Sequence, residues 1–214
     1  MLREETVEPA TLELLKQMVG LPEMKPFRLV GGTALSLLFG HRKSIDLDFF
    51  TDEPLQKEVF IPALEDAFGK VIPTNERSKV IYQCVIRNVK VDFVYVSDSF
   101  LNPVQIIDKI PFADTKDLIA LKLNAIKGRG VKKDFLDLAK LLKIYSFDEL
   151  FRFYYDRYPY DDSPALSRSV VYFDDAENTL APQSLDGMTW VKAKKVIIKS
   201  FDDYKKKDIK FNGC

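Results

Sequence analysis

The segment LVGGTALSLLFGHRKSIDLDFF, residues 29–50, constrains the fold more than any other part of the chain. A short apolar run over residues 27–30 predicts a strand that leads directly into Gly31 and Gly32. Helical spacing follows over residues 33–39, and residues 45–50 then alternate aspartate with apolar side chains as a strand does. The pattern predicts a strand–turn–helix–strand unit with the glycine pair at its first turn.

The remaining sequence divides into two parts that differ in hydrophobic periodicity. Strand-like runs occur only before Pro111, whereas helical periodicity dominates after it. The other predicted strands are 79–86 and 89–96, and the predicted helices are 6–19, 55–68, 115–127, 133–145, 147–155, 165–173 and 189–204. We therefore expect an α+β fold, with a mixed β-sheet flanked by helices over residues 1–111 and a mostly helical part over residues 112–214.

Composition excludes several classes of protein. With 214 residues, of which 46% are hydrophobic, the chain can bury a real core and is not intrinsically disordered. The longest uncharged stretch, Leu29 to His41, is too short for a membrane span, which needs about 20 apolar residues. Cys84 and Cys214 are too few for a disulfide framework or a zinc site, so we expect a reducing, cytoplasmic location and no membrane partner.

The charge balance limits the kinds of partner. The chain has 32 basic and 32 acidic residues, so any nucleic-acid binding must come from a local basic patch. His41 is the single histidine in the sequence, which excludes sites built on several histidines. We expect it to hold a loop rather than to take part in chemistry.

Asp46 and Asp48 are the first candidates for metal ligands. In a strand, residues two apart point to the same face and lie about 6.5–7 Å apart, so two such carboxylates can share one or two divalent cations. Aspartate is also a poor strand former, and two in one strand ask for an explanation. The alternative is a polar stripe that faces solvent on an edge strand.

Gly31, Gly32 and Thr33 are candidates for holding an anion. A glycine pair at the start of a helix leaves backbone N–H groups accessible, and the threonine hydroxyl adds a further donor. The alternative is an ordinary tight turn between a strand and a helix.

Asp92 is the third acidic candidate. It lies in VKVDFVYV, residues 89–96, which is otherwise apolar on both faces and therefore reads as a central strand. An unpaired carboxylate there is costly, and a metal ion shared with Asp46 and Asp48 removes that cost. Pairing with Lys90 or another base is the alternative.

Together these features follow the pattern of nucleotidyltransferases of the DNA polymerase β type. Such enzymes use three acidic residues to hold two Mg²⁺ ions, which here would be Asp46, Asp48 and Asp92. The two ions neutralise the triphosphate of an NTP and stabilise the attacking and leaving oxygens.

Three stretches resemble the AbiEii/AbiGii toxin family of nucleotidyltransferases more closely. They are residues 31–50, residues 114–142 (DTKDLIALKLNAIKGRGVKKDFLDLAKLL), and the weaker match of Tyr172 to Glu177 followed by Pro182 and Trp190. The resemblance implies a toxin of a bacterial toxin–antitoxin or phage-defence system that transfers nucleotides from an NTP. It also implies an antitoxin partner.

The resemblance extends the site to residues whose pattern alone reads as a basic surface loop and a capped helix. It implies that Lys122 contacts the triphosphate, and that Asp134 positions this lysine or assists the acceptor hydroxyl. It adds Arg129 and Lys133 to the nucleotide-binding set, and places Asp137 in the same motif. For residues 172–177 we expect helix packing.

Two residues of the loop before Asp46 complete the expected site. Arg42 is a candidate for binding a phosphate or an acid across the cleft, and Ser44 for shaping the loop that enters the strand. The predicted nucleotide-binding set is Gly31, Gly32, Thr33, Arg42, Ser44, Lys122, Arg129 and Lys133, and the predicted catalytic set is Asp46, Asp48, Asp92, Lys122 and Asp134.

The sequence thus predicts an Mg²⁺-dependent enzyme that moves an NMP from an NTP to an acceptor hydroxyl. The first candidate acceptor is the 3′ end of tRNA or another RNA, and the helical part is expected to complete the active-site cleft. Two alternatives stay open, namely transfer to a Ser, Thr or Tyr hydroxyl of a protein and nucleotide binding without turnover.

Overall fold

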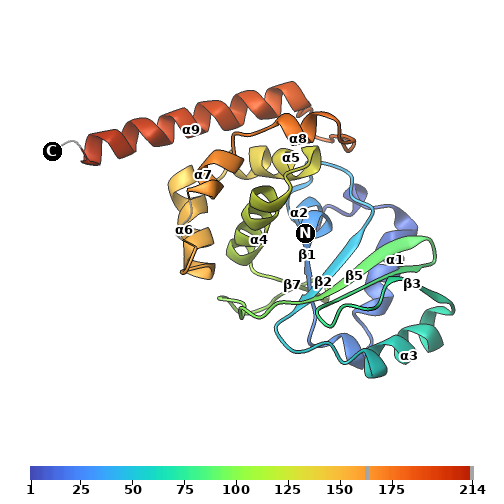
Figure 1. Cartoon of the computed structure of the whole chain (residues 1–214). Helices are drawn as coiled ribbons and strands as arrows, with labels where there is room; N and C mark the ends of the chain where they lie inside the picture. Colours follow the sequence, from blue (N-terminus) through green and yellow to red (C-terminus); the bar gives the residue numbers. More distant parts are fainter. Residues whose placement is uncertain (162–163, 213–214) are drawn as a thin grey trace. The chain divides into compact units, whose positions relative to one another are not determined.

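The computed structural model describes residues 1–161 and 164–212, so Cys214 lies outside the described residues. The chain divides into two compact units, residues 1–114 and the part from Thr115 onward. The first unit contains the β-sheet and the second consists of helices (Figure 1). The predicted α+β class is confirmed.

Residues 1–114 form a mixed seven-stranded sheet in the order β3-β4-β5-β2-β1-β7-β6. Its strands are β1 (Arg28–Val30), β2 (Leu47–Thr51), β3 (Val71–Asn75), β4 (Ile81–Ile86), β5 (Val89–Tyr95), β6 (Gln105–Ile107) and β7 (Ile110–Phe112). The helical segments of this unit are η1 (Glu4–Thr6), α1 (Pro9–Met18), η2 (Pro22–Met24), α2 (Gly31–Phe39) and α3 (Lys57–Phe68). β1 runs antiparallel to β2, and β2 runs parallel to β5, so β5 is internal as its apolar sequence predicts.

An aromatic cluster fixes one face of the central strands. The Phe93 ring on β5 stacks on Phe49 of β2 at 5.8 Å and contacts Phe27 at 5.3 Å and Phe60 of α3 at 4.8 Å. All four side chains are buried. Because side chains alternate along a strand, the neighbours of Phe49 and Phe93 project from the opposite face.

Three strands were not predicted from the sequence. β3 contains Pro73 and lies at one edge of the sheet, where the missing N–H is tolerated. β6 and β7 form a hairpin whose turn residues, Asp108 and Lys109, have φ values of 51° and 67°. Such a turn usually contains glycine, and this one has none, so the usual sequence signal for a hairpin is absent.

The second unit contains α4 (Thr115–Gly128), α5 (Lys132–Leu141), α6 (Phe147–Arg157), α7 (Ala165–Ser169), α8 (Asp174–Glu177) and α9 (Trp190–Asn212). α6 begins with a capping box, in which the Ser146 N–H donates to Glu149 Oε2 at 2.8 Å. α7 is shorter than the predicted helix 165–173, and it ends where the β-branched Val170 and Val171 follow. No helix in the described ranges is long and apolar enough to span a membrane.

Candidate active site

The sheet register places Asp48 and Asp92 next to each other. They are paired residues of the parallel strands β2 and β5, whose backbones lie about 4.8 Å apart, and both project from the face opposite the Phe49–Phe93 stack. Two of the three predicted acids are therefore held together by backbone hydrogen bonding alone.

Asp46 is placed differently from the prediction. The expected strand 45–50 begins only at Leu47, so Asp46 precedes β2 and does not share its ladder. Its backbone carbonyl instead accepts a hydrogen bond from the Thr33 hydroxyl. The argument from strand alternation thus holds for Asp48, whereas Asp46 belongs to the loop that enters the strand.

The carboxylate of Asp92 is only half satisfied. Its Oδ2 accepts hydrogen bonds from Lys90 Nζ and from Gln83 Nε2, both at 2.8 Å. Its Oδ1 is buried and has no hydrogen-bond partner. Pairing with Lys90, the alternative left open by the sequence, is therefore present, but a buried acceptor without a partner is costly and indicates a place for a cation or a proton.

The charges of all three acids affect the pKa of Lys90. Burial alone would lower the pKa of its ammonium group, but the hydrogen bond to Asp92 and the charges of Asp92, Asp46 and Asp48 raise that pKa overall. The three carboxylates thus contribute to one negative potential, although only Asp92 touches the lysine among the contacts described here.

Gly31 is required by the closeness of Asp48. Its φ of 71° lies in the left-handed region, and a Cβ at this position would lie 2.1 Å from Asp48 Oδ2. Gly32 faces a second crowded place, because its Cβ would lie 2.3 Å from the Arg42 guanidinium, itself only 2% exposed. The glycine pair is therefore more than a tight turn, since it lets the start of α2 approach an acid and an arginine.

Thr33 and Ser44 brace the loop that carries Asp46. The buried Thr33 hydroxyl donates to Ser44 Oγ at 2.9 Å, and the Ser44 N–H donates to the carbonyl of Thr6 at 2.9 Å. A hydroxyl has a single hydrogen, so the Thr33 proton is shared within the protein here. Ser44 shapes the loop as expected, and the contact of Thr33 with a nucleotide stays a prediction.

The acids fit a hard divalent cation by their chemistry. Mg²⁺ prefers carboxylate oxygens, and the orphaned Asp92 Oδ1 beside Asp48 supplies an unused one. Within residues 1–161 and 164–212, however, no three His, Cys, Asp or Glu side chains are grouped closely enough to hold a metal ion as they stand. The binding of a metal ion by Asp46, Asp48 and Asp92 stays a prediction.

The second unit holds a buried ionic cluster around Lys122 of α4. Its ammonium lies 2.8 Å from Asp134 Oδ1 and 2.8 Å from Asp137 Oδ2, both on α5. Asp134 also accepts the Val131 N–H at 3.2 Å, which caps α5. Burial alone would raise the pKa of the Asp134 carboxyl, but Lys122 and this cap hold it below its usual value. Asp134 thus holds the Lys122 ammonium, and both of its predicted roles in the reaction stay predictions.

The remaining residues suggested by the resemblance lie elsewhere on this unit. Arg129 is exposed in the turn after α4, and Lys133 is half-buried on α5. Their contacts with a nucleotide stay predictions.

The segment 172–177 packs against neighbouring helices, as expected. The Phe173 ring contacts Phe135 of α5 at 5.1 Å and Trp190 of α9 at 5.8 Å. Glu177 accepts the indole N–H of Trp190 at 2.9 Å.

Sequence reasoning missed Gln83 as a partner of Asp92. The signal was its position in the alternating pattern of β4, which pairs Gln83 with Asp92 in the register. That register depends on the hairpin turn at Arg87 and Asn88, so it could be counted only once the turn residues were known.

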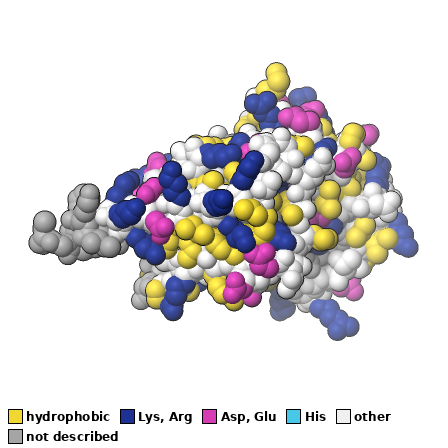
Figure 2. Space-filling view, turned by 90° about the horizontal axis from the view of Figure 1, so that it is seen from above, with side chains coloured by type: hydrophobic (Ala, Val, Ile, Leu, Met, Phe, Trp, Pro, Cys, Tyr) yellow, Lys and Arg dark blue, Asp and Glu magenta, His cyan; other side chains and the backbone are white. Residues whose placement is uncertain are grey.

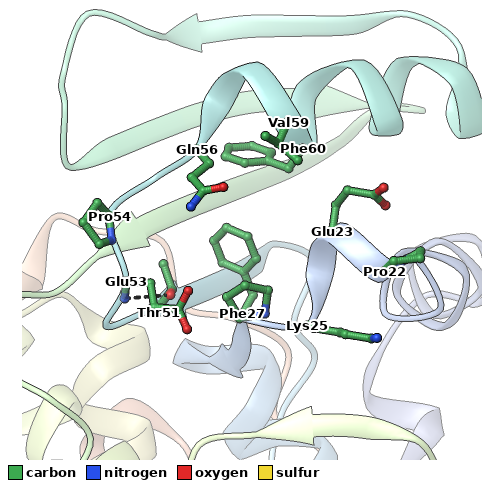
Figure 3. Close-up of a pocket in the computed structure, with 11 residues that line it drawn as sticks. Pro22, Glu23, Lys25, Phe27, Thr51, Glu53, Pro54, Gln56, Val59 and Phe60 are labelled. Carbon is green, nitrogen blue, oxygen red and sulfur yellow. Dashed lines mark hydrogen bonds between the residues drawn. The ribbon is translucent and has the colours of Figure 1, made fainter.

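A separate cavity of about 310 Å³ opens beside Phe27, Thr51 and Phe60. Figure 3 shows the Phe27 and Phe60 rings next to each other in its lining, where they pack edge to face. It adjoins the start of β1 and the end of β2, whereas Gly31 and Asp48 lie at the other ends of these strands. The cavity is therefore distinct from the predicted acid site.

The fold is that of nucleotidyltransferases. It is similar to MenT4, a nucleotidyltransferase toxin of Mycobacterium tuberculosis, with a TM-score of 0.59 and 14% identity over 89% of this chain and 88% of the other. It is also similar to a candidate nucleotidyltransferase from Helicobacter pylori, with a TM-score of 0.56 and 17% identity over 93% and 98% of the two chains.

Sequence comparison identifies the family. The model of the nucleotidyl transferase AbiEii toxin family, type IV toxin–antitoxin system, matches residues 13–184. An uncharacterized protein of Aquifex aeolicus is 33% identical over 174 residues, which cover 77% of this chain and 82% of that protein. The chain belongs to the AbiEii family and is a nucleotidyltransferase, as the motif resemblance predicted.

Proposed function

We propose that the chain transfers an NMP from an NTP to an acceptor hydroxyl, with Mg²⁺ bound at Asp46, Asp48 and Asp92. The observation that carries this proposal is the register pair Asp48–Asp92. In this pair Asp92 has a buried carboxylate oxygen without a partner, and Gly31 packs against Asp48. An ion pair with a purely structural role does not require an unpaired carboxylate oxygen.

In this proposal each acid has a defined task. Asp46 and Asp48 orient the triphosphate of the NTP, and Asp92 faces the acceptor. The acceptor oxygen forms a bond to the α-phosphorus while the bond to the β-phosphate bridging oxygen breaks, and pyrophosphate leaves. Asp92 accepts the proton of the hydroxyl through its unpaired Oδ1. When bound, Mg²⁺ supplies charge neutralisation of the phosphates and a lowered pKa for the hydroxyl.

The family resemblance assigns the remaining phosphate contacts to the glycine pair, Arg42, Lys122, Arg129 and Lys133. The burial of Arg42 against Gly32 supports a fixed cation at the start of α2. A helix start that offers backbone N–H groups beside an arginine suits a phosphate group.

For the acceptor we propose the 3′ end of tRNA. The part of the chain from Thr115 onward has 19 Lys and Arg against 15 Asp and Glu, so the neutral total hides an uneven distribution. On α9 the exposed Lys192, Lys195, Lys199 and Lys206 recur at helical spacing opposite the buried residue Ile197. Figure 2 shows Lys and Arg side chains spread along this helix, with Asp and Glu among them. Such a stripe suits an RNA backbone.

Incubation with each of the four α-labelled NTPs, Mg²⁺, and either total tRNA or total cell protein tests the proposal. We expect label on tRNA from one preferred NTP, and none after chelation of Mg²⁺. Label on protein alone would replace RNA by a protein hydroxyl as acceptor. Tight NTP binding without pyrophosphate release under all conditions would contradict catalysis.

Membership of a toxin family implies an antitoxin partner, and we propose that the transfer itself is the toxic activity. Expression of the wild type should arrest growth, whereas Asp48→Asn should not. Equal arrest by a variant that is expressed equally and has no transfer activity would separate toxicity from the reaction.

A further inference from the structure

Lys90 is the second residue of β5 and, with Asp92, one of the two charged residues of a strand that is otherwise apolar or aromatic. It lies on β5 between Val89 and Val91, which are 7% and 0% exposed, and two residues before Asp92. Strand alternation puts Lys90 on the same face as Asp92, and the register pairs Asp92 with Asp48 of β2. The lysine therefore lies on the face of the sheet that carries the acid site.

The contacts of Lys90 resemble those expected of a bound cation. Its ammonium lies 2.8 Å from Asp92 Oδ2. The other carboxylate oxygen, Asp92 Oδ1, has no partner. The ammonium therefore pairs with one oxygen of Asp92 and leaves the other oxygen without a hydrogen bond.

The lysine is also able to leave. Its side chain is 47% exposed, whereas that of Asp92 is 13% exposed. A lysine has a flexible four-carbon stem, so its ammonium can move to solvent without any shift of the backbone. Gln83 keeps its own hydrogen bond to Asp92 Oδ2 at 2.8 Å and can hold the carboxylate in place while the lysine moves.

We propose that Lys90 is a tethered counter-ion that occupies the cation position of the acid site in the absence of metal and yields it to the divalent ion. This inference rests on the proposed function, because it assumes that Asp48 and Asp92 bind the metal. In this way Lys90 regulates the binding of metal at the acid site. The lysine partly neutralises Asp92 in the metal-free protein, and it competes with the ion, so the site binds metal more weakly than it would without the lysine.

The competition is tested by metal binding without turnover. Wild type, Lys90→Met, Lys90→Arg and Lys70→Met are titrated with Mn²⁺, followed by electron paramagnetic resonance, and melted in EDTA and in Mn²⁺. Lys70 is an exposed lysine of the same unit and serves as the matched control. We expect Lys90→Met to melt lower in EDTA, to gain more from Mn²⁺ than the wild type, and to bind Mn²⁺ about tenfold more tightly. Lys90→Arg and Lys70→Met should behave like the wild type.

A second measurement uses the wild type alone and so does not depend on the folding of any variant. Lysines are labelled with an amine-reactive reagent, with and without Mn²⁺, and quantified by peptide mass spectrometry. Displacement predicts that Mn²⁺ raises the labelling of Lys90 several-fold and leaves that of Lys70 unchanged.

The outcomes separate this inference from the proposed function. Equal Mn²⁺ affinity in wild type and Lys90→Met, or unchanged labelling of Lys90 while Mn²⁺ is bound, would overturn the counter-ion role and leave the metal site intact. Absence of Mn²⁺ binding to both proteins, with and without NTP, would overturn the metal site and this inference together.

Discussion

The clusters of opposite charge around Lys122 and around Asp92, one in each unit, are built differently. Around Lys122 the lysine and both aspartates are 7% exposed or less, and the ammonium has two carboxylates at 2.8 Å. Around Asp92 the lysine is 47% exposed, and one oxygen of the carboxylate has no partner.

The difference separates a cluster that holds helices together from one prepared for a ligand. A buried ion pair is tolerable only when its hydrogen bonds are satisfied, and the Lys122 cluster meets that condition while it joins α4 to α5. The carboxylate of Asp92 does not have all its hydrogen bonds satisfied, as expected if a bound cation contacts its unpaired oxygen. If this contrast is right, substitutions in the first cluster lower stability, whereas substitutions in the second lower activity without lowering stability.

Lys122→Met should have the largest effect on stability. It leaves Asp134 and Asp137 buried without their cation, and we expect a loss of about 3–5 kcal/mol in the free energy of unfolding. Chemical denaturation checks this, with Lys133→Met on the less buried side of α5 as the control. Adding Asp134→Asn and Asp137→Asn should restore much of the loss. A loss below about 1 kcal/mol would show that the cluster does not hold the helices.

Asp48→Asn should lower activity rather than stability. The substitution keeps the shape of the side chain but removes a charge from the acid site, so we expect transfer to fall about 10²- to 10³-fold. The melting temperature should stay the same or rise, because repulsion between Asp48 and Asp92 is relieved. Transfer of label from NTP and a thermal melt measure the two effects. Full activity in the variant would remove Asp48 from the site.

Gly31→Ala tests whether the acid site is shaped by close packing. Its Cβ would collide with Asp48 Oδ2, whereas Gly69, with a φ of 81°, has no atom within 4 Å of such a Cβ. Both substitutions strain the backbone by about 1 kcal/mol or more, but only the first should also displace the carboxylate. We therefore expect Gly31→Ala to reduce transfer strongly and Gly69→Ala to reduce stability alone. Equal activity in both variants would contradict the close approach.

Acid should weaken the Lys122 cluster, with the smallest of these effects. The pKa of Asp134 lies below its usual value of 3.8, so this carboxyl contributes stability above pH 3.8. That contribution disappears as the pH falls through the lowered pKa of the folded state. The free energy of unfolding of the wild type should therefore decline more steeply below about pH 4 than that of Asp134→Asn. Parallel curves would indicate that Asp134 is not charge-paired in solution.

The sequence predicted the parts of the fold and site that depend on local pattern. The glycine pair, the aspartates of residues 46–48 and the apolar strand around Asp92 each carry a short-range signal, whereas the pairing of Asp48 with Asp92 comes from the register of β2 and β5. The change from strands to helices near Pro111 was equally visible, because it is a change of hydrophobic period.

What could not be predicted depends on contacts between distant residues. The start of β2 at Leu47 rather than residue 45 follows from the hydrogen bond between Thr33 and the carbonyl of Asp46. The partial pairing of Asp92 follows from Gln83, whose position depends on a turn without glycine. Local propensity does not encode either relation.

The central claim is that Asp48 and Asp92 together hold the metal that serves nucleotide transfer. Crystals of the protein with Mn²⁺ and a non-hydrolysable NTP analogue test it directly through the anomalous signal of the metal. The account predicts a manganese peak within coordination distance of both carboxylates, with the Lys90 ammonium moved away from Asp92. A well-occupied peak elsewhere, with Lys90 still on Asp92 beside a bound nucleotide, would contradict it.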